Sequence, residues 1–419
     1  MRNPNRIKKI MSEIEQLWEK NSDWRFGQLL SNIDFGNGKD IFYIEDNVLE
    51  EKLKESKKKF GIESDILKIG IDTGFGYGVS YWGEENKLTV PSVIKEITKK
   101  EALEQSKEIR EENIRNGKEL IIKYTEKTGE EDKIIEIERY FYVGDITLEK
   151  DSKAKRVLTT KRVGNIKHLV QILSLIGVAT DEEEIEVNLS MGLPVKMKGE
   201  ANALKKWLIG EYKIAFLNRG KDIERKITID KVVVLPQALA PVFSLEEKDY
   251  IGKMIVSADL GHYTNDMCLW TGKGTDKEYD YCGDGFYECY NEMRKILLND
   301  TNIMEVTTTI REKDIQEALE NGRVNLINGK NEVEFHREKV LKDYAIRVVE
   351  DIITMYETIF DDMDFLLLSG GIIENKDCVK MIIEEIEKYK IRILMPEEPQ
   401  YAVAKGLYNY LVRVLESKK

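Results

Sequence analysis

Two stretches of the sequence each end a run of apolar residues in an aspartate, with a glycine two residues later. The first reads Ile66-Leu-Lys-Ile-Gly-Ile-Asp-Thr-Gly-Phe-Gly-Tyr-Gly78. Its short, β-branched apolar run indicates a buried strand, with Asp72 at the carboxyl end. Gly74, Gly76 and Gly78 let the backbone approach another group closely, and backbone N–H groups in such a turn form an anion site. The adjacent carboxylate suits a hydrated divalent cation. Taken alone, the stretch is equally compatible with a glycine-rich hairpin turn.

The second stretch, Met254-Ile-Val-Ser-Ala-Asp-Leu-Gly-His-Tyr-Thr-Asn-Asp266, repeats the pattern in the other half of the chain. Asp259 ends the strand, Gly261 makes the turn, and residues 267–270 are expected to continue as the second strand of a hairpin. A repeat of this kind predicts two similar lobes that face a common cleft. A third buried strand, Phe365-Leu-Leu-Leu-Ser-Gly-Gly371, ends in a double glycine.

Composition limits the function classes. The chain has 419 residues, 42% of them hydrophobic, and a net charge of −12. That charge argues against direct binding to nucleic acid or to an anionic membrane. The four cysteines and three histidines show no metal-site spacing, so reduced cysteines in a cytoplasmic protein are expected. We find no apolar run of about 18 residues and no apolar signal-peptide core, so no membrane span or secretion signal is expected.

The first 65 residues predict a separate helical module. Apolar residues recur at helical spacing over residues 7–18 and 24–33, Gly36-Asn-Gly38 breaks the pattern, and a charged helix is expected over 47–59. We interpret residues 1–65 as a docking or folding appendage of unknown role.

From residue 66 onward, strands alternate with helices, which predicts an α/β fold. Residues 95–137 are strongly charged, and we expect them to form a solvated insertion of a helix and a hairpin. Further strands are predicted at 87–94, 134–143, 185–191, 212–217, 227–234 and 391–394, and helices at 163–177, 200–208, 286–300, 311–320, 336–360, 381–388 and 400–415.

A strand-Asp-x-Gly turn in each half, followed by strand-Ser-Gly-Gly, resembles the ordered motifs of the actin and heat-shock-chaperone ATPase superfamily. The sequence is most similar to its bacterial branch, the plasmid-segregating actin-like proteins of the ParM type, and the resemblance spans about residues 66–412. Four further stretches carry it: Val90-Pro-Ser-Val93, Tyr142-Val-Gly-Asp145, Gly192-Leu-Pro194, and Pro396-Glu-Glu-Pro-Gln-Tyr-Ala402 followed by Lys405-Gly-Leu407.

The resemblance implies an actin-like (ribonuclease H-like) fold, with lobe I at 66–250, lobe II at 251–419, and ATP or GTP with Mg²⁺ in the cleft between them. Asp72 and Asp259 would orient waters around Mg²⁺, and Gln237 would position the attacking water. The catalytic residues implied are therefore Asp72, Gln237 and Asp259. The nucleotide-binding residues implied are Gly74, Phe75, Gly76, Tyr77, Gly78, Gly261, His262, Tyr263, Thr264, Gly370 and Gly371.

The sequence departs from the family at three positions. Val79 stands where actin-like proteins often carry a lysine that reaches the phosphates, and Lys95 or another lysine is a candidate replacement. His262 and Tyr263 are bulkier than the residues usual in the second turn. For His262 a position in a surface turn is favoured over phosphate contact, whereas for Gln237 a surface position at a helix start is the alternative to the catalytic role.

The expected function is that of a cytoplasmic, polymerising ATPase whose filaments segregate or position plasmid or phage DNA. Its partners would be further copies of itself and a DNA-binding adaptor protein, which agrees with the acidic chain. The alternatives are a scaffold that binds nucleotide without hydrolysing it, for which Val79 is the support, and a small-molecule kinase of the same superfamily, for which the first half shows no clear catalytic aspartate.

Overall fold

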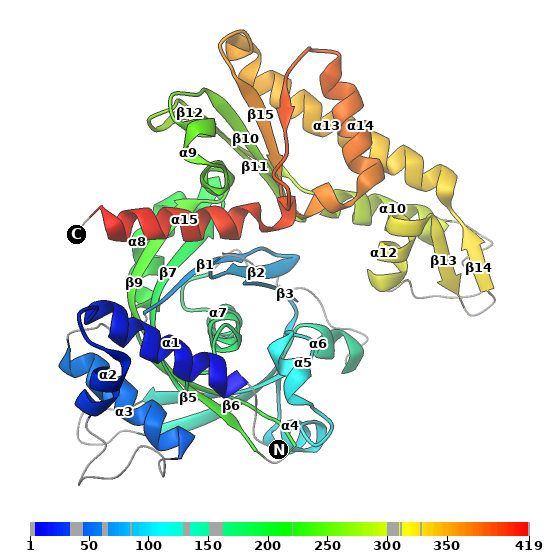
Figure 1. Ribbon diagram of the computed structural model, residues 1–419. Helices are drawn as coiled ribbons and strands as arrows, with labels where there is room; N and C mark the ends of the chain where they lie inside the picture. Colours follow the sequence, from blue (N-terminus) through cyan, green and yellow to red (C-terminus); the bar gives the residue numbers. More distant parts are fainter. Residues whose placement is uncertain are drawn as a thin grey trace. The chain divides into compact units, whose positions relative to one another are not determined.

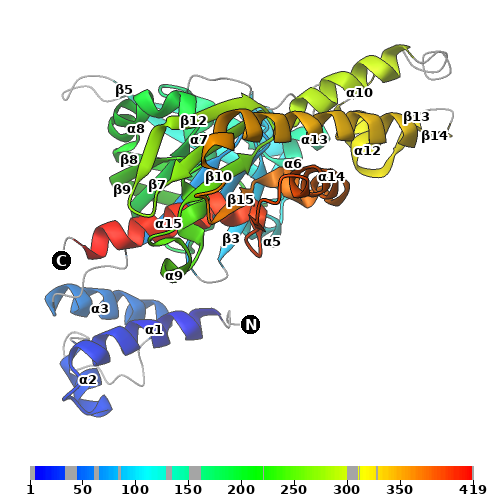
Figure 2. The same cartoon turned by 90° about the horizontal axis from the view of Figure 1, so that it is seen from above.

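The computed structural model describes residues 5–33, 45–60, 66–83, 86–128, 135–150, 162–219, 221–299, 310, 312–326 and 329–417. The chain forms two compact units, Met1–Ile66 and Leu67–Lys419 (Figures 1 and 2). Among the described residues, no helix is both long enough and apolar enough to span a bilayer.

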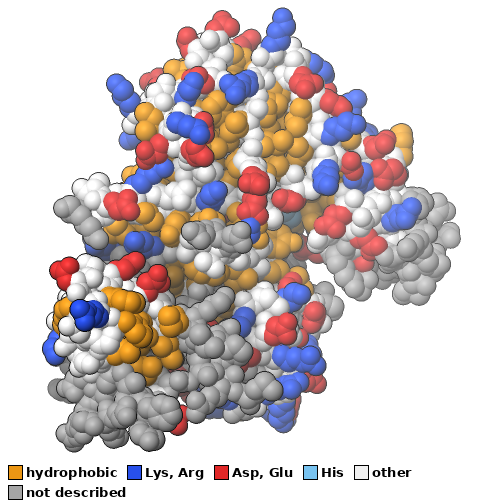
Figure 3. Space-filling model, in the orientation of Figure 1, with side chains coloured by type: hydrophobic (Ala, Val, Ile, Leu, Met, Phe, Trp, Pro, Cys, Tyr) orange, Lys and Arg blue, Asp and Glu red, His pale blue; other side chains and the backbone are white. Residues whose placement is uncertain are grey.

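The N-terminal unit contains α1 (Asn5–Lys20), α2 (Phe26–Asn32) and α3 (Asp46–Lys59), so the helices predicted there are confirmed. The predicted break at residues 36–38 lies outside the described residues. Side chains from all three helices share a small core of Ile14, Leu17, Leu29, Ile33 and Leu53. Hydrophobic side chains also gather on one face of this unit (Figure 3), and the exposed ones include Met11, Trp18 and Phe26.

A nine-stranded sheet forms the first lobe of the larger unit, in the order β3-β2-β1-β7-β9-β8-β5-β6-β4. β1 pairs antiparallel with β2 and parallel with β7, and β7 pairs parallel with β9. The strands are β1 (Leu67–Thr73), β2 (Tyr77–Tyr81), β3 (Lys87–Pro91), β4 (Ile94–Ile97), β5 (Leu120–Thr128), β6 (Ile135–Val143), β7 (Glu184–Leu193), β8 (Gly210–Phe216) and β9 (Ile223–Pro236).

A five-stranded sheet forms the second lobe, in the order β12-β11-β10-β15-β16. β10 pairs antiparallel with β11 and parallel with β15, and β15 pairs parallel with β16. Each sheet therefore contains three antiparallel strands followed by two parallel ones, and the repeat predicted from the sequence is confirmed. The strands are β10 (Ile255–Leu260), β11 (Thr264–Trp270), β12 (Thr275–Asp284), β15 (Phe365–Ser369) and β16 (Ile393–Leu394).

Helices complete the two cores. α7 is almost wholly buried and shares one core with the nine-stranded sheet, whereas α13 and α14 share the core of the second sheet and lie beside β15 (Figure 1). A separate hairpin of β13 (Arg323–Leu326) and β14 (Gly329–Glu332) follows α12. The helices are α4 (Lys99–Gln105), α5 (Glu111–Arg115), α6 (Asp145–Lys150), α7 (Ile166–Val178), α8 (Ala201–Leu208), α9 (Glu247–Tyr250), α10 (Tyr287–Asn299), α12 (Glu312–Asn321), α13 (Glu334–Tyr356), α14 (Lys376–Glu387) and α15 (Ala402–Glu416), with short 3₁₀ turns η2 (Val195–Glu200), η3 (Ala240–Ser244), η4 (Glu357–Ile359), η5 (Gly371–Glu374) and η6 (Pro399–Tyr401).

The charged segment 95–137 contains helices, α4 and α5, and enters a hairpin, the antiparallel pair β5–β6, as predicted. The prediction that it is a solvated insertion was wrong, because β5 lies inside the sheet between β8 and β6. Leu120, Ile121 and Ile122 are fully buried. These three apolar residues decide the placement of the strand, although charged neighbours dominate the composition of the segment.

Two other local predictions differ from the structure. The single strand predicted over 87–94 is divided into β3 and β4, because the chain turns after Pro91, which has no N–H to continue a ladder. β12 was not predicted, since it is an edge strand with little burial and a mixed polar sequence.

The last helix, α15, packs against the first lobe, although its position in the chain placed it in the predicted lobe II. A Cβ added at Gly70 of β1 would lie 2.2 Å from the Ala404 carbonyl oxygen of α15. A Cβ at Gly406 would lie 1.7 Å from the Ala240 carbonyl oxygen of η3. Both glycines are therefore needed for backbone-to-backbone contact.

Gly406→Ala is expected to lower the free energy of unfolding by about 2 kcal/mol or more, because its methyl group would overlap backbone that cannot rotate away. Denaturant titration of the purified protein measures this. Gly199→Ala is the control, since a Cβ there meets nothing within 4 Å, and it should change the unfolding free energy by less than about 0.5 kcal/mol. Equal stability of the two variants would contradict the packing described for α15.

Candidate functional site

A cleft of about 620 Å³ lies where the loops that follow β1, β10 and β15 meet. In the two hairpins, Asp72 pairs with Val79 and Asp259 pairs with Asp266, so the hairpins correspond residue by residue. Because parallel neighbours lie beside β1 and β10 in each sheet, both aspartates reach the carboxyl edge of a sheet, where ligands bind in open α/β folds.

The structure places all but one of the predicted site residues around this cleft. They are Asp72, Gly74, Phe75, Gly76, Tyr77, Gln237, Asp259, Gly261, His262, Tyr263, Thr264, Gly370 and Gly371. Gly78 is the exception. It lies in β2 and faces α7, where an added Cβ would be 2.5 Å from Gln171 Nε2, so its lack of a side chain serves packing rather than the cleft.

Three carboxylates lie close together in and beside the cleft: Asp72 and Asp259 line it, and Asp266 pairs with Asp259 in the second hairpin. Burial raises the pKa of Asp72, and the Gln237 side chain and the Arg162 charge oppose that rise. Burial, together with the charges of Asp72 and Asp266, raises the pKa of Asp259 well above its usual range. Burial also raises the pKa of Asp266. Burial is the largest cause of each shift, so the site favours the charged form of these carboxylates less than water does.

Asp266 received no role from its sequence motif, and the structure shows that it joins the lobes. One carboxylate oxygen accepts a hydrogen bond of 2.9 Å from the Val195 N–H, which directly follows the Gly192-Leu-Pro194 turn of the first lobe. The other accepts 2.8 Å from the Thr264 hydroxyl. The signal in the sequence was its spacing, since Asp266 follows Asp259 by the same distance as Val79 follows Asp72.

Gln237 is buried and points into the cleft, so the alternative of a surface residue was wrong. Its side-chain amide donates a hydrogen bond to Asp72 Oδ1, and its exposed fraction is 4%. The adjacent strand leaves room for it, because a Cβ at Gly192 would lie 2.6 Å from Gln237 Cγ. The surface alternative placed Gln237 at the start of a helix, but the structure has only the short turn η3 (Ala240–Ser244) there.

The two glycines that follow β15 act differently. Gly370 has a φ of +101°, and an added Cβ would lie 2.4 Å from the Leu260 carbonyl oxygen and 2.7 Å from Asp259 Oδ1. It is therefore required for the close approach of β15 to β10. A Cβ at Gly371 would meet nothing within 4 Å, so this backbone borders open space in the cleft.

Aromatic rings connect the two glycine turns across the cleft. The ring centre of Phe75, from the first turn, lies 5.1 Å from that of Tyr263 in the second turn. The Tyr263 ring stacks on the Tyr287 ring, with 4.5 Å between their centres. His262 contacts Tyr290 at 5.0 Å. The bulky residues of the second turn thus belong to an aromatic cluster, and His262 is part of the cleft lining rather than of an open surface turn.

The cations of the cleft do not come from the predicted positions. Val79 lines the cleft, but Lys95 lies in β4 opposite Tyr142, away from it. Arg162, Arg337 and Lys376 are the basic residues among those that line the cleft. Arg337 donates hydrogen bonds to the Glu334 carboxylate at 2.8 Å, to the Asp377 carboxylate and to the Leu319 carbonyl oxygen at 2.9 Å. Sequence reasoning missed Arg162, because no motif precedes α7.

A hydrated divalent cation fits the acidic residues of the cleft better than a directly ligated one. In the described part of the chain, no group of three or more His, Cys, Asp or Glu side chains converges to hold a metal ion. A bound cation would favour the charged forms of Asp72 and Asp259, whose pKa values burial raises. Two such carboxylates can orient the water shell that Mg²⁺ retains in proteins.

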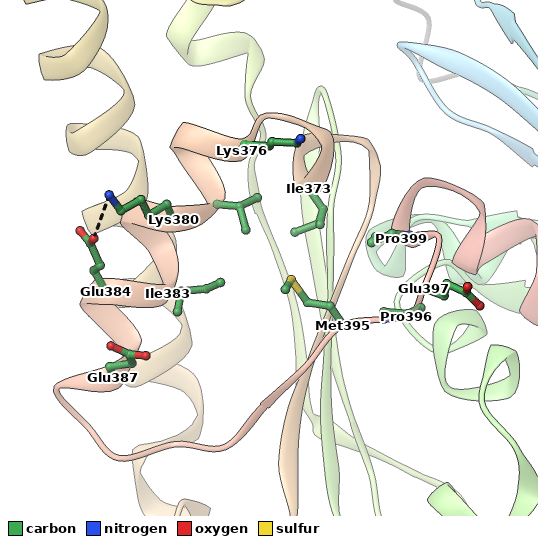
Figure 4. A pocket seen from close by; sticks show the side chains of 11 residues that line it. Ile373, Lys376, Lys380, Ile383, Glu384, Glu387, Met395, Pro396, Glu397 and Pro399 are labelled. Atoms are coloured by element: carbon green, nitrogen blue, oxygen red, sulfur yellow. Dashed lines mark ion pairs between the residues drawn. The ribbon is translucent and has the colours of Figure 1, made fainter.

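A second groove, of about 700 Å³, lies between α14 and residues 395–399. Figure 4 shows Ile383 and Met395 directed toward it, and the Lys380–Glu384 ion pair of 3.8 Å lies on α14. It contains neither of the Asp-x-Gly turns, so it lacks the features expected of a nucleotide site.

Comparison with known proteins agrees with this geometry. Residues 70–239 match the family described as the N-terminal domain of actin-like proteins. The chain is similar to the crystal structure of the actin-like protein Alp7A, with 16% identity, 84% of this chain and 97% of the other covered, and a TM-score of 0.64. No curated protein sequence matches significantly.

Two ParM structures are similar over comparable lengths. A 15-stranded ParM filament from Clostridium botulinum shares 15% identity, with 84% of this chain and all of the other covered (100%) and a TM-score of 0.67. ParM from Bacillus thuringiensis with ATP shares 18% identity, with 85% and 100% covered and a TM-score of 0.60.

The chain therefore has the actin-like fold, with its two lobes placed around one cleft. The resemblance to ParM-type actin-like proteins stated from the sequence motifs is confirmed.

Asp259→Asn is expected to stabilise the nucleotide-free protein at neutral pH. Because its pKa is raised in the folded state, Asp259 binds a proton more tightly there than in the unfolded chain. Protonated Asp259 stabilises the folded state fully below its ordinary pKa of 3.8. This stabilisation is lost as the pH rises toward the pKa of Asp259 in the folded protein. The Asn side chain stays neutral at every pH, so the melting temperature of the variant should exceed that of the wild type by a margin that grows as the pH rises above 3.8 toward the folded pKa of Asp259.

Asp364→Asn is the matched control with the opposite sign. The Met254 N–H and Lys253 lower the pKa of Asp364, so its contribution is present above the unfolded pKa and is lost as the pH falls through the folded one. This variant should melt below the wild type at neutral pH. If Asp259→Asn also melts below the wild type throughout, the charge balance described for the cleft is wrong.

Proposed function

We propose that this protein is a polymerising actin-like ATPase that binds ATP, or GTP, with Mg²⁺ in the cleft between its lobes. The observation that carries this proposal is the convergence of two Asp-x-Gly hairpins and the double glycine after β15 on one cavity. The actin-like fold supports it, as does the similarity to a ParM structure from Bacillus thuringiensis that holds ATP.

In this proposal, the phosphates lie between the two turns. The backbone N–H groups of Gly74 and Gly76 face them from the first lobe. The turn from Gly261 to Thr264 lies on the side of the second lobe, where the Gly261 N–H already donates to the Thr264 carbonyl at 3.0 Å. The adenosine lies toward Gly371, where the backbone borders open space. Asp72 and Asp259 hold the waters of Mg²⁺, which neutralises charge on the phosphate oxygens when it is bound.

Gln237 is the residue we assign to the attacking water. Its amide nitrogen is directed at Asp72, so the side chain is already oriented toward the metal side of the cleft. An amide can accept from a water and donate to it without being a strong base, and orienting a nucleophilic water is the role of glutamine in other phosphoryl-transfer sites.

The finer function that we propose is the assembly of cytoplasmic filaments that position plasmid or phage DNA through an adaptor protein. One of the similar structures is a ParM filament, which supports self-association. The net charge of −12 favours an indirect link to DNA, because like charges repel. The N-terminal unit, with its exposed Trp18 and Phe26, is a candidate docking appendage.

A scaffold that binds nucleotide without hydrolysing it is the second candidate. Val79 favours it, because an apolar side chain lines the cleft where the family often has a phosphate-binding lysine. A small-molecule kinase has no comparable support among the described residues that line the cleft.

Light scattering and phosphate release, followed together after mixing the protein with ATP and Mg²⁺, test the proposal. We expect scattering to rise first and phosphate release to follow it. Asp259→Ala should reduce phosphate release by at least about 100-fold, because it removes a carboxylate that holds the waters of the metal, and its circular dichroism should match that of the wild type.

Other results separate the candidates. Scattering that never rises at any protein concentration contradicts the filament function. Polymer without phosphate release favours the scaffold, and phosphate transfer to an added small molecule favours the kinase. Repeating the assay with GTP determines the preferred nucleotide.

Gln237→Ala should slow phosphate release at saturating ATP by about 100-fold, since the attacking water loses its orienting group. The filaments of this variant should persist longer than wild-type filaments formed with the same amount of ATP. Gln316→Ala is the control, because Gln316 also lines the cleft but bonds to Glu320 rather than to Asp72. Depolymerisation at equal rates in Gln237→Ala and the wild type would remove Gln237 from the hydrolytic step.

A further inference from the structure

Arg162 is a buried cation at the first glycine turn. Its exposed fraction is 4%, and its side chain lines the cleft. Its Nη1 donates to the Thr73 hydroxyl at 3.0 Å and to the Gly192 carbonyl at 3.2 Å. Its guanidinium carbon lies 5.8 Å from the centre of the Phe75 ring. The side chain is therefore held against the loop that follows Asp72.

Most of the hydrogen-bonding capacity of this guanidinium is unused within the described residues. A guanidinium has five N–H donors in a fixed fork, and the two bonds above occupy only Nη1. In the part of the chain that the structure describes, no carboxylate lies within ion-pair distance of Arg162. A buried cation with free donors costs free energy unless an anion completes its hydrogen bonds.

We propose that Arg162 contacts the terminal phosphates of the bound nucleotide and supplies the positive charge that Val79 cannot. This inference rests on the proposed nucleotide site and adds a specific residue to it. Nε and Nη2, which the described residues leave open, form the planar pair that binds two oxygens of a phosphate, and a single ammonium cannot match it. In this proposal, the positive charge at the phosphates comes from Arg162, in the segment before α7, rather than from a residue of β2.

Thr73 and His168 hold the guanidinium in place. His168 is buried, and burial with the neighbouring Arg162 charge lowers its pKa to about 3, so the ring is neutral. Its Nδ1 lies 3.3 Å from the Arg162 carbonyl oxygen, which only accepts, so Nδ1 carries the proton. Its Nε2 then accepts from the Thr73 hydroxyl at 2.9 Å, leaving the Thr73 oxygen to accept from Arg162. Each of these hydrogen bonds therefore joins one donor to one acceptor.

Thr73 and His168 are positioning residues, because Thr73 bonds to Arg162 and His168 bonds to Thr73. Neither appears among the residues that line the cleft, so they act on the nucleotide through Arg162. Because Thr73 directly follows Asp72 in β1, the same strand end fixes both the metal-side carboxylate and the phosphate-side cation.

Dissociation constants for ATP and AMP, measured with Mg²⁺ on the full chain, test the assignment. Arg162→Met should weaken ATP binding about 10- to 100-fold, because a charge-assisted hydrogen-bond pair is lost. It should leave AMP binding within about 2-fold, since AMP lacks the terminal phosphates. Arg162→Lys should recover part of the loss, because it restores the charge without the planar fork. Lys95→Met is the matched control and should bind both nucleotides like the wild type.

Thr73→Val keeps the shape of the side chain and removes the hydroxyl, so it should weaken ATP binding about 3- to 10-fold. Thr73→Ser should restore it, and AMP binding should not change in either variant. These variants keep the test valid if Arg162→Met fails to fold.

Three results have distinct meanings. A wild-type protein that binds neither ATP nor GTP contradicts the proposed function itself. A wild type that binds ATP, with Arg162 variants that bind ATP and AMP as tightly as it does, overturns only the role of Arg162. Arg162 variants with a lower melting temperature and an unchanged ratio of ATP to AMP affinity show that Arg162 only compensates the charge of the aspartates, which also overturns the proposal.

Discussion

The gathering of Asp72 and Asp259 in one cleft, with the buried Asp266 beside them, is the constraint on which the rest of the larger unit depends. Burial raises the pKa of each, and for Asp259 the charges of the other two raise it further. Such a cluster persists because other groups hold it: the Val195 N–H and Thr264 hydroxyl bind Asp266, and the Gln237 amide binds Asp72. The charge that remains is the part a bound cation would offset.

The two lobes share one strand arrangement, yet the corresponding positions carry different chemistry. In the second hairpin Asp266 reaches across to the first lobe, whereas in the first hairpin the corresponding Val79 is apolar. The lobes are joined at two further points, by the contact of Phe75 with Tyr263 and by α15, which packs on β1 through Gly70. A change at either glycine turn therefore acts on both lobes, which is the property that the proposed nucleotide-dependent assembly would use.

Charge in the cleft comes from segments that are distant in the sequence. Asp72 and Thr73 end β1, Arg162 precedes α7, and His168 lies within it. Together they place a carboxylate and a guanidinium on neighbouring sides of one loop, and the neutral histidine orients the guanidinium without adding charge. The substitution of Val79 for a lysine therefore does not leave the first glycine turn without a cation.

The sequence by itself determined the local elements and the pairing of the two Asp-x-Gly turns, because an apolar run that ends in Asp and Gly is a local signal. It therefore predicted the fold class and the repeat, and nearly all of the residues that it assigned to the site do line the cleft. It failed where neighbours from other segments decide the outcome. Charged flanks concealed β5, whose Leu120 to Ile122 are buried only because β6 and β8 lie beside it. Gly78 serves α7, Gln237 is buried, and Arg162 reaches the turn from outside every motif. Only the tertiary structure decides such contacts, since hydrogen bonds and burial depend on which distant residues the fold brings together.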